Sequence, residues 1–73
     1  GNTMATRQMI FDALVKHAEG QIAKHKTNVE VYMKNAVGVG EHTDILESIG
    51  KEINHIGKYV EQIEVLEKII KKD

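Results

Sequence analysis

The residues best suited to chemistry are a glutamate and a histidine in the second half of the chain. Glu52-Ile53-Asn54-His55 follows the Glu-x-x-His pattern, which binds two metal ions in four-helix bundles when other helices add further glutamates. The helical phase argues against such a site. If Ile49 points inward, Glu52 lies about 60° and His55 about 120° from that direction at 100° per residue. We therefore expect a solvated or boundary pair, with no bound metal or other cofactor.

A second chemical candidate is His25, which falls where the pattern of a helical seam calls for an apolar residue. A single polar residue in such a seam often fixes register or oligomeric state. The structural interpretation is a partly buried histidine that is hydrogen-bonded across a helix interface. A pH-sensitive switch or a ligand-binding role is the alternative. The chain has one serine and no cysteine, so no nucleophilic grouping can be argued and we expect no enzymatic activity.

The segment 35–44, NAVGVGEHTD, holds two of the six glycines and raises the question of a phosphate-binding loop at a helix N-terminus. No Lys-Ser/Thr pair follows it and no strand precedes it, as a P-loop requires. Glu41 and Asp44 would repel an anion. We interpret the segment as the turn between two helices. The predicted turn consists of Gly38, Gly40, Glu41 and His42.

Length and composition predict one small domain, residues 1–73, that needs stabilisation from outside its own core. Disulfides and cysteine-based zinc sites are excluded because cysteine is absent. Oligomerisation is the remaining common route. The formal net charge of -1 provides no general attraction to nucleic acid or to anionic membranes. Since no apolar run suits a membrane span and no signal peptide is visible, we expect a cytoplasmic location.

Apolar spacing predicts a first amphipathic helix from about residue 3 to about residue 34. The seam positions alternate in steps of four and three, which is the period of a helix that packs along one face. They are Phe11, Val15, Ala18, Ile22, His25, Val29, Tyr32 and Ala36.

A second helix is expected from about residue 43 to about residue 71. One heptad position is isoleucine four times in succession, which marks the centre of an apolar stripe. These residues are Ile49, Ile56, Ile63 and Ile70. Leu46, Ile53 and Val60 widen the stripe on one side. A short connection between helices of similar length predicts an antiparallel hairpin, and hence an all-α fold.

The stripe on the second helix is wider than one partner helix can cover, so we expect two hairpins to form a four-helix bundle, with a homodimer favoured. Gly50 and Gly57 alternate with the large residues of the row Leu46, Ile53, Val60. Two helical glycines one heptad apart suggest a close helix contact within the chain or between subunits; simple tolerance at a surface is the alternative. The predicted core and oligomer interface comprise Ile49, Gly50, Ile53, Ile56, Gly57, Val60, Ile63 and Ile70.

The segment VGVGEHTDILESIGKEI and the later EQIEVLEKII resemble small helical proteins of tailed phages of marine bacteria, cyanophages among them, and of marine metagenomes. Those proteins carry a similar Val-Gly-(Val/Ile)-Gly-Glu-His motif before an acidic-apolar helix. The most specific part is Val37 to His42. The residue after the histidine is often proline in that family and is Thr43 here. The resemblance implies a phage origin and a small helical hairpin, with no assigned activity or substrate.

Two classes of function follow from these patterns. The first is a non-enzymatic structural or protein-interaction module, a homo-oligomeric bundle in the cytoplasm of the host cell that binds an unidentified protein partner. The alternative is a metal- or ligand-binding four-helix bundle that uses Glu52 and His55. The outward phase of these two residues and the absence of cysteine favour the first class.

Overall fold

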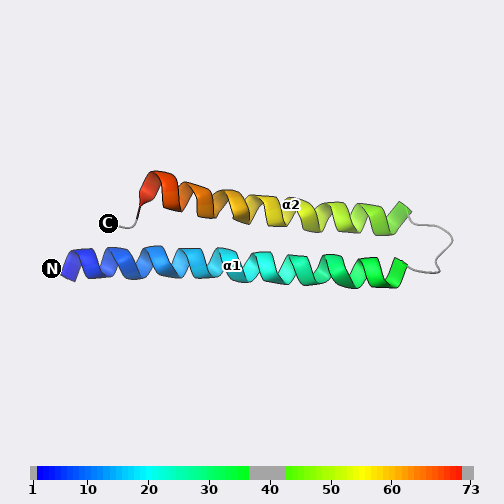
Figure 1. Cartoon of the computed structure of the whole chain (residues 1–73), viewed down its shortest axis with the longest axis horizontal. Coiled ribbons are helices and arrows are strands. Elements are labelled where there is room, and N and C mark those ends of the chain that lie inside the picture. The colour runs from blue at the N-terminus through cyan, green and yellow to red at the C-terminus, as the bar shows by residue number, and fades with distance from the viewer. Residues whose placement is uncertain (1, 37–42, 72–73) are drawn as a thin grey trace.

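The chain forms two long antiparallel helices that lie side by side, with both termini at the same end of the molecule (Figure 1). The structure is a computed structural model and describes residues 2–36 and 43–71. Helix α1 spans Asn2–Ala36 and α2 spans Thr43–Val65; a short π-helix, η1, continues α2 over Leu66–Ile70. The described residues contain no strand. The predicted all-α helical hairpin is therefore confirmed.

The helix ends differ from the expected ones in two places. Helix α1 begins one residue earlier and ends two residues later than predicted. The predicted α-helix from 43 to 71 is wrong in its last turn, which is wider. There the backbone N–H of Lys71 donates to the carbonyl of Leu66, five residues back, at 2.7 Å, the pattern of a π-helix. The predicted turn residues Gly38, Gly40, Glu41 and His42 lie outside the described residues.

The core of the hairpin comes from one stripe of α1. Phe11, Ala18, His25 and Val29 are buried, and Ala18 is fully covered. The three most N-terminal of these are seven residues apart, so a single face of α1 meets α2 over most of its length. This placement agrees with the seam expected for the first helix.

Helix α2 contributes no buried residue, although its apolar pattern is the stronger of the two. Ile49, Ile56 and Ile63 are half-buried against α1. The row beside them remains exposed: Leu46 at 66%, Ile53 at 53% and Val60 at 41%. One partner helix thus covers only part of the apolar face of α2.

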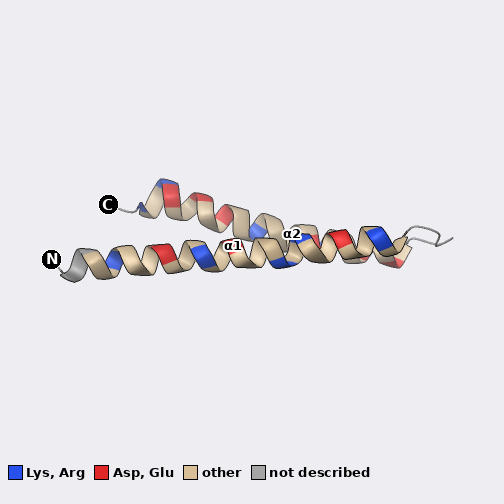
Figure 2. Ribbon diagram, turned by 60° about the horizontal axis from the view of Figure 1, so that its bottom comes forward, with Lys and Arg blue, Asp and Glu red and all other residues tan. Residues whose placement is uncertain are grey.

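The molecule is a rod rather than a globule. Its extents are 61 × 17 × 11 Å and its radius of gyration is 16.9 Å, where a compact chain of this length would have about 11 Å. The accessible surface is 5654 Å², against about 4,500 Å² for a folded monomer of this mass. Both helices carry basic and acidic residues along their length (Figure 2), so the excess surface is not a patch of one charge.

Candidate functional site

A polar cluster crosses the helix interface halfway along the hairpin. Nδ1 of His25 on α1 lies 3.0 Å from Oε1 of Glu52 on α2, and the amide of Asn28 donates to the same oxygen. His25 and Asn28 reach α2 together because residues three apart share one helix face. The His25 and Glu52 side chains are only 10% and 13% exposed. The cluster therefore replaces apolar packing with directed hydrogen bonds at the centre of the molecule.

The chemistry of Glu52 fixes the proton on His25. An ionised carboxylate only accepts hydrogen bonds, so Nδ1 of His25 must carry the hydrogen that lies between the two groups. The hydrogen bond from His25 is the main cause that lowers the pKa of Glu52, and the hydrogen bond from Asn28 acts in the same direction, while desolvation opposes both. The cluster thus keeps Glu52 ionised and oriented toward α1.

Aromatic rings extend the cluster along the interface. The His25 ring stacks on His55 with centroids 4.4 Å apart and planes 13° apart, and it lies 6.3 Å from the Tyr59 ring. His17 meets Tyr59 edge-on at 6.0 Å.

The structure joins residues that the sequence patterns treat separately. Glu52 and His55 belong to one motif, and each of them contacts His25, which the patterns assign to a separate seam. Sequence reasoning missed Asn28 as a second donor and Tyr59 as a neighbour of the stack. The available signal for Asn28 is its place one turn after His25, on the same face of α1.

The geometry of this cluster suits the positioning of one helix against the other. Among the described residues, no group of three histidine, cysteine or acidic side chains is arranged to hold a metal ion. Oε1 of Glu52 accepts hydrogen bonds from both His25 and Asn28. The two donors, His25 and Asn28, lie on α1 and their acceptor, Glu52, lies on α2. These hydrogen bonds hold the two helices at one axial register, because a shift of one helix by one turn would separate the donors from the acceptor.

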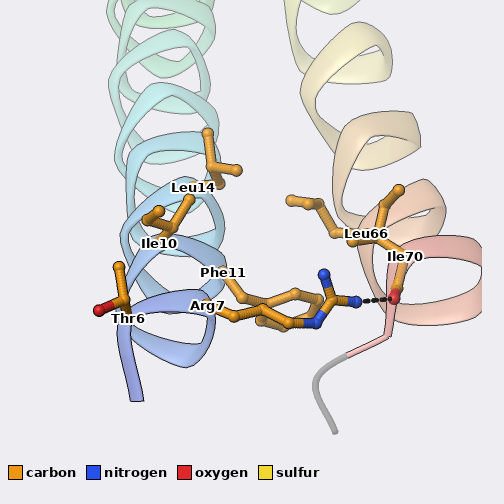
Figure 3. A pocket seen from close by; sticks show the side chains of 7 residues that line it. All are labelled: Thr6, Arg7, Ile10, Phe11, Leu14, Leu66 and Ile70. Atoms are coloured by element: carbon orange, nitrogen blue, oxygen red, sulfur yellow. Dashed lines mark hydrogen bonds between the residues drawn. The ribbon is translucent and has the colours of Figure 1, made fainter. Parts of the chain in front are cut away.

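A shallow groove of about 500 Å³ lies between the helices at the end that carries both termini (Figure 3). Leu14, Phe11 and Leu66 provide much of its apolar wall. The Arg7 guanidinium crosses the end of the groove and donates to the carbonyl oxygens of Ile70 at 2.7 Å and Lys71 at 3.0 Å. Arg7 therefore ties α1 to the C-terminal turn, whose last carbonyls lack partners within the helix.

The residues predicted for the core and oligomer interface all lie on α2 and η1. Ile49, Ile56, Ile63 and Gly50 are half-buried; Ile53, Gly57, Val60 and Ile70 are exposed. A Cβ atom added at Gly50 or Gly57 would meet no atom within 4 Å. The close contact proposed for these glycines is therefore absent among residues 2–36 and 43–71, and a contact between subunits stays a prediction.

The chain was compared with protein-family models, with curated proteins and with solved structures, and none matches. No helix among residues 2–36 and 43–71 is long and apolar enough to cross a membrane. The function therefore has to be argued from the surfaces and contacts of the hairpin itself.

Proposed function

We propose that the protein is a non-enzymatic interaction module, a helical hairpin that associates with a second copy of itself into a four-helix bundle. One observation carries the proposal: the row Leu46, Ile53, Val60 is exposed at 66%, 53% and 41% on the most amphipathic helix of the chain. Exposed rows of this kind on a single chain mark interaction surfaces.

The surface area of the rod supports this proposal. The chain exposes about 1,100 Å² more than a compact monomer of its mass, and a stable interface buries about 800 Å² on each partner. Association of two hairpins would therefore remove about the amount of surface that is in excess. The small net charge of -1 produces little repulsion between two copies.

Sedimentation equilibrium tests the proposal. The wild-type chain is expected to have a mass near twice 8.2 kDa at micromolar concentration. Ile53→Glu places a charge in the exposed row and is expected to shift the mass to that of a monomer, because an unpaired carboxylate would be buried between the copies. Asn54→Glu adds the same charge at the next residue, which is also exposed, and is expected to remain a dimer.

A monomeric wild-type chain of full helicity would overturn the proposal. Metal analysis of the same samples separates it from a metal-binding bundle that uses Glu52 and His55. Stoichiometric metal that is lost in His55→Ala would favour that second function instead.

The origin and cellular partner of the module rest on the resemblance of Val37–His42 to proteins of marine tailed phages. On that ground we propose that the hairpin is phage-encoded, acts in the cytoplasm of the infected cell and there binds a further protein through its outer surface. Affinity capture from infected cells, with Ile53→Glu as the bait for comparison, tests whether a host or phage protein is retained and whether the dimer is needed.

A further inference from the structure

The exposed row of α2 has a symmetry that specifies how a second copy would pack on it. Leu46 and Val60 each lie seven residues from Ile53. At 100° per residue, the three side chains fall within an arc of about 40°. All three are at least 41% exposed. The row is thus a straight apolar ridge, and Ile53 is its midpoint.

Gly50 and Gly57 leave two gaps beside this ridge. They lie three residues before and four residues after Ile53, so they too are arranged nearly evenly about the midpoint. In the part of the chain that the structure describes, no close contact requires either glycine, because an added Cβ would meet no atom within 4 Å at either place. Glycine is a poor helix former, but it permits another backbone to approach closely.

We propose that α2 pairs with the α2 of a second copy in antiparallel orientation, about a two-fold axis that passes by Ile53. This inference rests on the proposed function and specifies its interface. Antiparallel pairing places Leu46 of one copy against Val60 of the other and brings Gly50 near Gly57. The large residues of the two copies then meet along one side of the contact, and the facing glycines let the two backbones approach closely along the other side.

Symmetry and charge favour this arrangement over a parallel pair. A two-fold axis makes the interface self-complementary, which is the commonest form of association for soluble homo-oligomers. Antiparallel helices also set the positive end of each helix dipole beside the negative end of the other. A parallel pair would bring the acidic starts of both helices together, with Asp44 beside Asp44.

The absence of cysteine from the chain permits a direct test by disulfide cross-linking of single-cysteine variants. Ile53→Cys is expected to form a covalent dimer on mild oxidation, because the two thiols meet at the axis. Leu46→Cys alone is not, since its copies would be about 21 Å apart along the helix, and cysteines with Cα atoms more than about 7 Å apart do not form a disulfide. Mixing Leu46→Cys with Val60→Cys is expected to produce the mixed dimer.

Lys51→Cys serves as the control, because Lys51 is exposed and lies about 160° around α2 from Ile53 at 100° per residue. It is expected to cross-link at least tenfold more slowly than Ile53→Cys. The mixed pair of Leu46→Cys and Val60→Cys tests the same geometry without altering Ile53, so loss of folding in one variant does not remove the test.

The outcomes separate this inference from the proposed function. A dimer by sedimentation in which Leu46→Cys and Val60→Cys each cross-link to themselves would establish a parallel pair and overturn the inference alone. A dimer that cross-links at none of these positions would place the interface elsewhere and also overturn it. A monomeric wild-type chain would overturn both proposals.

Discussion

Glu52 shows how a single carboxylate makes the stability of the hairpin depend on pH. Hydrogen bonds from His25 and Asn28 lower its pKa, so the unfolded chain takes up this proton more readily than the folded chain does. The stabilisation is complete above the ordinary glutamate pKa of about 4.3 and is lost as the pH falls through the lower pKa of the folded state.

We therefore expect acid to destabilise the wild-type protein more than Glu52→Gln. Urea unfolding midpoints at pH 6 and pH 3 measure this difference. The variant is expected to have the lower midpoint at pH 6 and a smaller change between the two pH values. Glu47→Gln, at an exposed position of the same helix, is expected to follow the wild type. An equal pH response in Glu52→Gln and the wild type would contradict the role of the cluster.

Ala18 has no exposed surface, so it lies within the contact between α1 and α2. Ala18→Leu adds three carbon atoms at a site without room for them. Overpacking of this kind destabilises by about 1–3 kcal/mol. Ala13→Leu, at an exposed position of the same helix, is expected to change the free energy of unfolding by less than about 0.5 kcal/mol. Chemical denaturation measures the free energy of unfolding of both variants. Equal changes in Ala18→Leu and Ala13→Leu would show that the helix contact at Ala18 is loose.

At the scale of the element, the wide last turn of the C-terminal helix receives a contact from the other end of the sequence. Arg7 donates to the carbonyls of Ile70 and Lys71, and Lys71 has a positive φ of 58°, which an L-residue adopts at some cost. The contact therefore holds the end of η1 in a conformation that its local sequence does not favour.

Arg7→Met is expected to free this turn while it keeps the apolar part of the side chain over the groove. Hydrogen exchange at the amide of Lys71 measures the change, and exchange about tenfold faster than in the wild type is expected, which corresponds to about 1.4 kcal/mol. Exchange in the middle of α2 is expected to remain the same. Unchanged exchange at Lys71 would show that the turn forms without Arg7.

The glycines of α2 are also a feature of one element. Replacing them is expected to have opposite effects on the stability of the helix and on the affinity of the proposed dimer. Gly57→Leu is expected to stabilise the isolated hairpin by about 0.8 kcal/mol through helix propensity, since an added Cβ meets no atom within 4 Å. The same change is expected to weaken the dimer at least tenfold. Gly20→Leu on α1, where space is also open, is expected to keep the dimer. Sedimentation and thermal unfolding measure the two effects; a strengthened Gly57→Leu dimer would show that the glycines are merely tolerated.

At the scale of the whole molecule, a rod of two helices has too little interior for its length. Only Phe11, Ala18, Val29 and His25 are buried among the described residues, and small domains with so limited a core usually need further stabilisation. If a second copy of the chain supplies this stabilisation, folding and dimer formation occur as one coupled equilibrium.

The melting temperature is therefore expected to depend on protein concentration. For a dimer of 146 residues, twice 73, a tenfold rise in concentration is expected to raise it by about 4 °C. Ile53→Glu is expected to melt at a lower temperature that is independent of concentration. Circular dichroism at protein concentrations between about 2 and 200 μM measures the melting temperatures of the wild type and of Ile53→Glu, because about a hundredfold range of concentration is enough to resolve the shift. A wild-type melting temperature without concentration dependence would contradict coupled folding and association.

The sequence alone determined the two helices and the seam of the first one. Helical periodicity is a local property, and each amphipathic stripe can be read within its own segment. Thus Phe11, Ala18 and Val29 are buried where the pattern predicted them. The same local reading also indicated that the stripe on the second helix is wider than one partner can cover.

Only the tertiary structure decided which residues meet across the hairpin. The contact of His25 with Glu52 depends on the axial shift and rotation of one helix against the other, and neither quantity is encoded in a single segment. The same holds for the contact from Arg7 to Ile70 and for the exposed state of Leu46, Ile53 and Val60. These features depend on how the two helix faces pack against each other, because all contacts along the interface together set the relative position of the helices.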